Sequence, residues 1–119
     1  MSRMFGPYPG RVEGWIDGDT ARVALDLGFG ITLAPRDFDG KPLISMRVFG
    51  INTPELNTPE GVAALAYAGV ICPAGTRVTV LSHGWDKYGG RFDGSLTLPG
   101  GQDYATLMIA AGHGVAYTP

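Results

Sequence analysis

Residues 11–27, RVEGWIDGDTARVALDL, carry the signal that decides the fold. Two apolar segments flank Asp17 and Gly18, and an Asp-Gly pair in that setting is typical of the tight turn of a β-hairpin. In the second segment apolar residues alternate with polar or small ones, which predicts a strand with one buried face. The residues of that face are Ala21, Val23, Leu25 and Leu27. Asp19 falls on the same face, where a carboxylate is costly unless it is paired, so we expect a partner for it.

Downstream of this hairpin the chain continues in short β-type segments separated by turn residues. A polar loop over residues 35–42 (PRDFDGKP) should connect a short strand to a returning strand over residues 43–51. Arg47 is the only charged residue of the returning strand. The residues that share its face by period-two alternation are Leu43, Phe49 and Ile51. The segments 76–82 and 91–98 predict two further strands.

The motif Asn-Thr-Pro-Glu occurs twice, at residues 52–55 and 57–60, and the two copies predict different structures. The second copy suits a helix start. Thr58 can cap the helix, proline is favoured in its first turn, and Glu60 lies near the positive end of its dipole. The alanine-rich segment that follows predicts a helix over residues 60–71. Its apolar face is expected to contain Val62, Leu65, Ala66 and Val70.

The number and order of these elements favour one fold class. About five strands, one helix inserted between the later strands and a second helix over residues 102–111, stopped by Gly112, predict an α+β protein, mainly β. A small curled antiparallel sheet with these helices fits a five-stranded OB-fold β-barrel. Nineteen glycines and nine prolines among 119 residues favour short strands and tight turns. The length suits a single domain, 1–119, with a core over about residues 11–117.

The composition limits the class of protein. Nine basic residues against eleven acidic ones give a net charge of −2, which counts against a nonspecific nucleic-acid binder of the usual basic kind. The single cysteine, Cys72, excludes an internal disulfide and is expected to be a small buried apolar residue. No apolar run is long enough to span a membrane, and the N-terminal residues contain no apolar stretch of signal-peptide length. We therefore expect a cytoplasmic monomer with no membrane partner.

Three polar clusters contain the residues that could carry chemistry: 17–20 (DGDT), 46–55 (MRVFGINTPE) and 86–91 (DKYGGR). They hold carboxylates, an amide, a tyrosine and cations, but no histidine or cysteine at metal-ligand spacing. Oxygen ligands favour a hard cation such as calcium or magnesium over zinc. Cationic side chains beside such a metal favour a phosphate ligand. Together these groups are of the types that catalyse phosphodiester hydrolysis.

These fragments and their order resemble the staphylococcal (micrococcal) nuclease, or thermonuclease, family. IDGDT comes first, MRVFGINTPE and a helix follow, and DKYGGR precedes GHGVAY near the end. The resemblance runs from about Arg11 to Tyr117. It implies an OB-fold domain that binds calcium, rather than magnesium or manganese, and that cleaves DNA and RNA.

The resemblance also implies roles for the residues at matching positions. The metal ligands would be Asp19, Asn52 and the backbone carbonyl of Thr53. The catalytic residues would be Glu55, which positions or deprotonates the attacking water, and Arg47 and Arg91, which hold the phosphate. The residues that contact the nucleotide would be Lys87, Tyr88 and Tyr117.

Two departures from the family pattern leave alternatives open. Asn52 stands where the reference member has an aspartate, so we expect weaker metal binding. An extra glycine, Gly90, precedes Arg91, so either a bulge carries Arg91 into the site or the arginine is displaced. The same barrel could then be a nucleic-acid- or protein-binding module that does not cleave, or a structural domain of a phage-like assembly. His83 and His113 are expected to be structural or surface residues. Trp85 is expected to be a packing residue, with base stacking on a single strand as the alternative.

Overall fold

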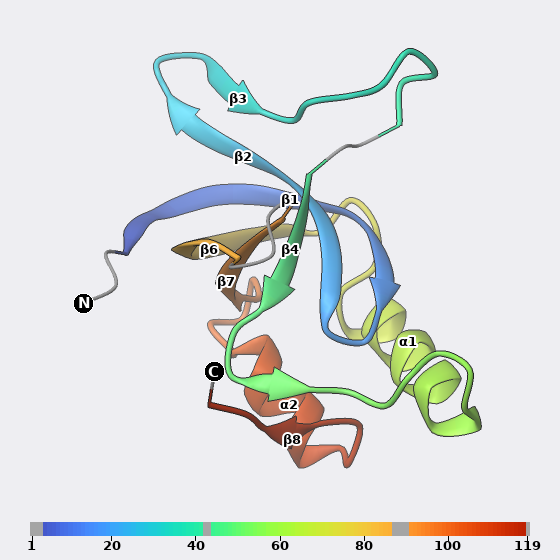
Figure 1. Ribbon diagram of the computed structural model, residues 1–119. Helices are drawn as coiled ribbons and strands as arrows, with labels where there is room; N and C mark the ends of the chain where they lie inside the picture. The colour runs from blue at the N-terminus through green and yellow to red at the C-terminus, as the bar shows by residue number, and fades with distance from the viewer. Residues whose placement is uncertain (1–3, 42–43, 87–90, 119) are drawn as a thin grey trace.

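Five β-strands close into a barrel in the computed structural model, which describes residues 4–41, 44–86 and 91–118 (Figure 1). The barrel strands are β1 (Phe5–Asp17), β2 (Thr20–Gly28), β4 (Ser45–Val48), β6 (Arg77–Trp85) and β7 (Arg91–Thr97). Their order around the barrel is β1-β2-β4-β7-β6, with β6 returning to β1. Every neighbouring pair is antiparallel except β4 and β7, which are parallel. This closed barrel with two helices confirms the predicted α+β class and is compatible with an OB-fold.

The predicted hairpin is present, but Gly18 is needed for close packing and not for a left-handed turn conformation. Asp17 pairs with Thr20, so Gly18 and Asp19 are the two loop residues. The φ angle of Gly18 is not in the left-handed region. A Cβ atom at Gly18 would instead lie 3.0 Å from the Cβ atoms of Thr53 and Ala64. The glycine therefore lets the loop approach Thr53 and the inserted helix closely.

The face predicted for Arg47 is wrong. Met46 and Val48 are buried in the barrel core, so Arg47 lies on the outer face of β4. Gly50, with a φ angle of 88°, ends the alternation in a turn, and the chain resumes as β5 (Ile51–Asn52). Ile51 is fully buried, so it does not share the outer face of Arg47 as predicted, and Leu43 is outside the described residues. β5 pairs with β8 (Val115–Ala116) in a separate two-stranded ribbon.

The inserted helix α1 (Pro59–Ile71) begins as predicted, since the Thr58 hydroxyl accepts a hydrogen bond from the Gly61 amide at 3.0 Å. The predicted apolar face is wrong. The buried residues of α1 are Gly61, Ala64 and Ala68, whereas Val62 and Val70 are exposed. Small residues face inward because the helix packs close to the chain before it: a Cβ at Gly61 would lie 1.8 Å from the Glu55 carbonyl oxygen.

The second helix, α2 (Tyr104–Ala110), covers one end of the barrel (Figure 1). The Tyr104 ring is fully buried and stacks on Trp15 with 4.5 Å between ring centroids. Its hydroxyl donates a 2.6 Å hydrogen bond to the Gly18 carbonyl, which ties α2 to the β1–β2 loop. Gly112 (φ 80°) follows the helix, as predicted, and Cys72 is a buried free thiol. Within the described ranges, neither helix is long and apolar enough to cross a membrane.

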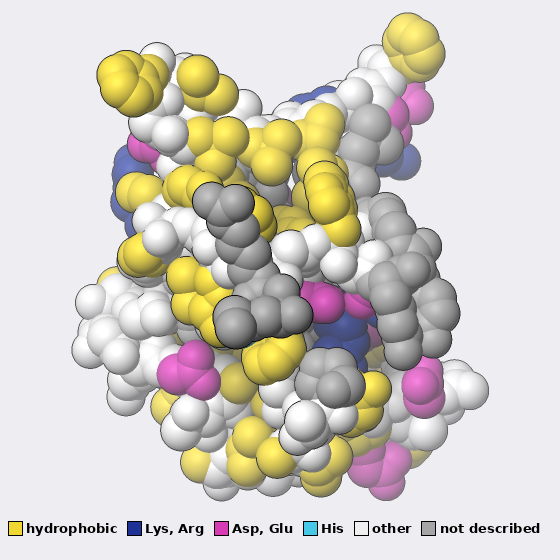
Figure 2. Space-filling model, turned by 60° about the vertical axis from the view of Figure 1, so that its left-hand side comes forward, with side chains coloured by type: hydrophobic (Ala, Val, Ile, Leu, Met, Phe, Trp, Pro, Cys, Tyr) yellow, Lys and Arg dark blue, Asp and Glu magenta, His cyan; other side chains and the backbone are white. Residues whose placement is uncertain are grey.

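Two segments project from the other end of the barrel: the turn between β2 and β3 (Ile31–Leu33), and the loop that follows β3. Phe29 and Phe38, one on each projection, are fully exposed. Figure 2 shows hydrophobic side chains at the ends of both projections and on the surface between them. An ion pair between Arg36 and Glu13 of β1 ties the second projection to the barrel. This end of the molecule is therefore apolar and open, unlike the end covered by α2.

Candidate active site

The Arg47 guanidinium lies at the centre of a polar cluster on the outer face of β4. Its Nη2 atom is 3.8 Å from Asp19 Oδ2, donates to Asn52 Oδ1 and donates to the Ile51 carbonyl at 3.1 Å. Its Nη1 atom donates to the Val48 carbonyl at 3.3 Å. Both charged side chains are largely removed from water, with 16% of Arg47 and 13% of Asp19 exposed. Burial at this level makes the pair stronger than an ordinary surface ion pair.

Asp19 joins the polar cluster around Arg47 to the neighbouring backbone by several hydrogen bonds. Its Oδ2 atom accepts a 3.1 Å hydrogen bond from the Thr53 amide, which joins the β1–β2 loop to the segment after β5. Its Oδ1 atom accepts from the Thr20 hydroxyl at 3.2 Å, and its backbone carbonyl accepts from the Val48 amide at 2.8 Å. The partner expected for this carboxylate therefore exists, and it is a set of donors rather than one residue. Asp19 is a loop residue beside the outer face of β4, so its predicted position on the core-facing side of β2 is wrong.

A neighbouring carboxylate, Asp17, was not predicted as part of the site. Its Oδ1 atom accepts a 3.0 Å hydrogen bond from the Asp19 amide. Burial, and then the hydrogen bond and charge of Asp19, raise the pKa of Asp17 to about 6. The DGDT motif thus places two interacting carboxylates at the loop, not one.

Tyr117 reaches the cluster through the β5–β8 ribbon. Its amide donates to the Gly50 carbonyl at 2.8 Å, which extends the pairing of Ile51 with Ala116. The Tyr117 ring lies 5.4 Å from the Arg47 guanidinium carbon, within cation–π range. The structure therefore brings this sequence-predicted residue beside Arg47 from the far end of the chain.

Arg91 lies in an adjacent cluster on β7. Its Nε atom is 3.5 Å from Asp86 Oδ2, and its carbonyl accepts from the Asp86 amide at 2.9 Å. Asp93 is in register with Arg47 across the parallel β4–β7 pair. Burial, and then a hydrogen bond and charge repulsion from Asp86, raise the pKa of Asp93, while the charges of Arg47 and Arg91 oppose the increase. Arg91 is therefore near the Arg47 cluster but is paired with Asp86.

Sequence reasoning missed Asp93, although a signal for it exists. Arg91 and Asp93 are two residues apart on one strand, so they face the same side as the outward residues of β4. Recognising that β4 and β7 are neighbours would have placed Asp93 beside Arg47. That pairing is parallel and long-range, which local alternation does not reveal.

Glu55 lies on the exposed chain between β5 and α1. Its backbone carbonyl accepts hydrogen bonds from the Thr58 hydroxyl at 2.6 Å and the Thr58 amide at 3.0 Å, which fixes this segment. Its carboxylate forms no hydrogen bond or ion pair with any residue in the described ranges. Glu55 follows Thr53 by two residues, so its Cα is within about 7 Å of a residue bonded to Asp19. Lys87, Tyr88 and Gly90 lie outside the described residues.

The oxygen atoms around Arg47 are of the type that a hard cation prefers: a carboxylate from Asp19, an amide oxygen from Asn52 and the Ile51 carbonyl. They meet at the Arg47 Nη2 atom, so a cation could use them if that guanidinium turned toward another anion. Thr53 presents its N–H, not its carbonyl, to Asp19. Among the described residues, no three His, Cys, Asp or Glu side chains are grouped closely enough to hold a metal. The donor set fits calcium in chemistry, and it predicts weak binding.

The two histidines have structural contacts. His83 Nε2 lies 2.8 Å from the Ser95 hydroxyl, and the His83 ring stacks on Phe49. His113 packs against the Tyr67 ring at 4.7 Å. These contacts agree with the structural roles expected from the sequence.

Comparison with known proteins finds no family model that matches the chain and no curated protein that matches it.

Proposed function

We propose that this chain is a thermonuclease-type phosphodiesterase that hydrolyses DNA, RNA or both with the help of calcium. One observation carries the proposal. Arg47 contacts Asp19 and Asn52, Asp19 binds the Thr53 amide, and these residues come from two separate motifs, 17–20 and 46–55. Four of the motif residues that the thermonuclease resemblance marks for metal and phosphate thus share one network of contacts.

The two arginines supply the groups for a phosphate. Arg47 and Arg91 are on neighbouring parallel strands and are offset by two residues. Strand geometry then separates their Cα atoms by about 8 Å, so both long side chains can reach one phosphodiester or two successive ones. A guanidinium fork binds two phosphate oxygens, and losing one such donor to the transition state costs about 3 kcal/mol. When a phosphate arrives, Arg47 exchanges its protein oxygens for phosphate oxygens, which frees Asp19 and Asn52.

Asp19, Asn52 and a nearby backbone carbonyl would hold calcium, which when bound would supply positive charge next to the phosphate. Glu55 carries the proton-transfer role, since its exposed carboxylate is uncommitted among the described residues and the hydrogen bonds from Thr58 fix its backbone. A carboxylate in that position accepts a proton from the attacking water. Tyr117 packs beside Arg47 and limits the directions the guanidinium can take.

A second candidate function rests on a specific observation. Arg47 already neutralises Asp19 and contacts the uncharged Asn52. The Arg47 guanidinium therefore competes with calcium for these two oxygen ligands. If calcium cannot displace it, the same arginines could hold a nucleic acid without cleaving it. The domain would then be a binding module.

A digestion of end-labelled single-stranded DNA distinguishes the two candidates. Cleavage in calcium and none in chelator is the expected result at high protein concentration. Equal cleavage in both would refute the calcium requirement. No cleavage in either, together with binding of the same DNA in chelator, would favour the binding module.

A further inference from the structure

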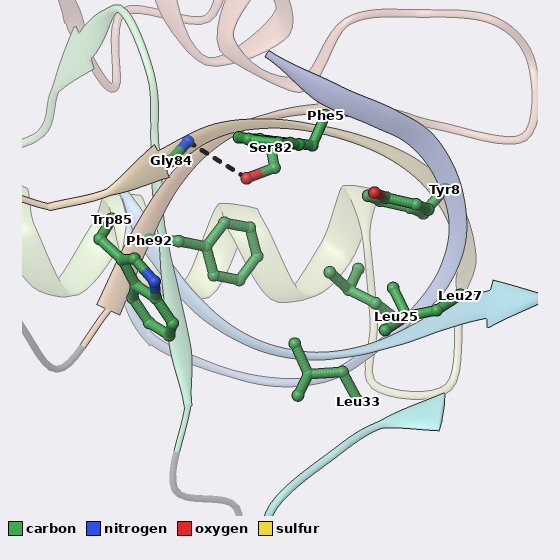
Figure 3. A pocket seen from close by; sticks show the side chains of 9 residues that line it. All are labelled: Phe5, Tyr8, Leu25, Leu27, Leu33, Ser82, Gly84, Trp85 and Phe92. Carbon is green, nitrogen blue, oxygen red and sulfur yellow. Dashed lines mark hydrogen bonds between the residues drawn. The ribbon is translucent and has the colours of Figure 1, made fainter. Parts of the chain in front are cut away.

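An open cavity of about 290 Å³ lies at the end of the barrel away from α2. Its walls come from the start of β1, the end of β2, β3, the end of β6 and the start of β7 (Figure 3). The lining residues are Phe5, Tyr8, Leu25, Leu27, Leu33, Ser82, Gly84, Trp85 and Phe92. Leu25 and Phe92 are buried at its base, whereas Trp85 is 67% exposed. The packing role expected for Trp85 is therefore wrong.

The cavity exists because β6 is irregular at its rim. The register between β6 and β7 shifts between Ser82 and Trp85, and Gly84 has a φ angle of 94°. A bulge of this kind redirects the next side chain, here Trp85, and is common at barrel rims. Small residues at positions 82 and 84 leave space where a large side chain would fill the barrel.

Polar atoms on the rim face this apolar space. Figure 3 shows the Tyr8 hydroxyl, the Ser82 hydroxyl and the Trp85 indole nitrogen on the inner sides of their residues. The Ser82 oxygen accepts a hydrogen bond from the Gly84 amide at 3.2 Å, so its proton remains available to donate. The cavity therefore combines aromatic walls with several donors, which suits a flat, aromatic ligand whose edge carries acceptors.

The cavity adjoins the candidate phosphate site. Trp85 is paired with Phe92 across β6 and β7, and the next residues on the outer side, Asp86 and Arg91, form the ion pair described above. Successive residues on a strand point to opposite faces and are 3.8 Å apart at Cα. Phe92 thus lines the cavity, while its neighbour Arg91 is on the other side of β7, where it pairs with Asp86.

We propose that this cavity binds an unstacked nucleobase of a single-stranded substrate, with Trp85 as its stacking platform. This inference rests on the proposed function, and it specifies the substrate as single-stranded nucleic acid. Proteins that bind single strands combine cationic groups along the backbone with aromatic platforms for bases. A base in a duplex could enter only after unpairing, which costs a few kcal/mol. An aliphatic ligand would fill the walls but leave the inward-facing donors unpaired.

Base binding can be measured without turnover. The protein in chelator is titrated with thymidine 5′-monophosphate and, separately, with deoxyribose 5-phosphate, while tryptophan emission is recorded. Trp85 and Trp15 are the two tryptophans, and Trp15 is stacked against Tyr104 inside the protein. The nucleotide should quench Trp85, and the sugar phosphate should not. Trp85→Ala changes an exposed side chain and leaves the core intact. It should weaken nucleotide binding, measured by calorimetry, at least about fivefold.

A second variant keeps the test independent of the tryptophan signal. Ser82→Phe places a ring in the cavity and leaves Trp85 and Arg91 unchanged. It should also weaken nucleotide binding and slow cleavage of single-stranded DNA, while hydrolysis of a base-free diester, an abasic oligodeoxynucleotide that carries no aromatic ring, stays at the wild-type rate. Equal binding of nucleotide and sugar phosphate, or wild-type nucleotide binding in both variants, would overturn the cavity assignment.

The failure of the proposed function would give a different result. If the wild-type protein hydrolyses neither DNA nor the base-free diester, but binds the nucleotide in a way that both variants weaken, the hydrolase assignment fails and the base site stands. If it hydrolyses the diester and both variants cleave single-stranded DNA normally, the hydrolase assignment stands and the base site fails.

Discussion

Replacing Asn52 by aspartate should strengthen calcium binding. In the wild-type protein the Asn52 amide oxygen meets Asp19 at the Arg47 guanidinium, so the substitution adds one negative charge where a cation would sit. The side chain changes little in shape, and an oxygen atom is already present at the contact. The expected effect is therefore almost entirely electrostatic.

The size of the effect follows from charge and distance. A unit charge interacting with another at about 5 Å contributes about 0.8 kcal/mol in a water-like dielectric and about 3.3 kcal/mol at an effective dielectric of 20. The doubly charged calcium ion gains twice this interaction energy from the added carboxylate. The singly charged guanidinium of Arg47, which competes for the same oxygens, gains it once. The net gain is then about 0.8 to 3.3 kcal/mol, or about 4-fold to 250-fold tighter calcium binding.

Titration calorimetry with calcium at pH 7 and low salt measures this change. Asn57→Asp is a matched control, because it makes the same substitution in the second Asn-Thr-Pro-Glu copy. It should leave calcium affinity nearly unchanged. If Asn52→Asp and Asn57→Asp have the same affinity, or if Asn52→Asp binds calcium more weakly than the wild type, Asn52 is not at a cation site.

Two further predictions concern stability. Tyr104→Phe removes the 2.6 Å hydrogen bond to the buried Gly18 carbonyl, so the free energy of unfolding should fall by about 1–3 kcal/mol; a change below about 0.5 kcal/mol in urea denaturation would contradict this contact. The pKa of Asp93 is raised by burial and by Asp86, so its contribution to stability is full below about pH 4 and is lost as the pH rises through the raised pKa. Asp93→Asn should therefore be more stable than the wild type at pH 7 and should lose less stability between pH 4 and pH 7. The exposed control Asp39→Asn should follow the wild type, and an identical pH dependence in all three proteins would refute the reasoning.

Local sequence signals predicted the elements well. The Asp-Gly pair marked the β1–β2 hairpin, and Thr58 with the following proline marked the start of α1. Both signals depend on residues within a few positions of each other, which is why they can be recognised without the fold. The same holds for Gly112 at the end of α2.

Errors arose where long-range packing decided the outcome. The inward face of α1 consists of Gly61, Ala64 and Ala68. Gly61 lies too close to the Glu55 carbonyl for a larger residue, and Ala64 lies against Gly18 of the β1–β2 loop. Hydrophobicity alone would have chosen the valines, which are exposed. In the same way, the exposure of Trp85 depends on a bulge between two strands and is not visible in its local sequence.

The candidate site was only partly accessible from the sequence. The motifs suggested Asp19, Arg47 and Asn52 together, and these residues are in contact. The additional carboxylates, Asp17 and Asp93, join the site through a loop and a parallel strand pair, respectively. Their effect is electrostatic and depends on burial, which only coordinates reveal.

The most direct test of the central claim compares Glu55→Gln with Glu60→Gln, the same change in the two copies of one motif. The assay is the initial rate of calcium-dependent cleavage of single-stranded DNA, with a thermal melt of each protein. Glu55→Gln should lose at least about 100-fold in rate with nearly unchanged melting, because it removes the group that accepts the proton. Glu60→Gln should retain nearly the wild-type rate, and equal losses in the two variants would contradict the account.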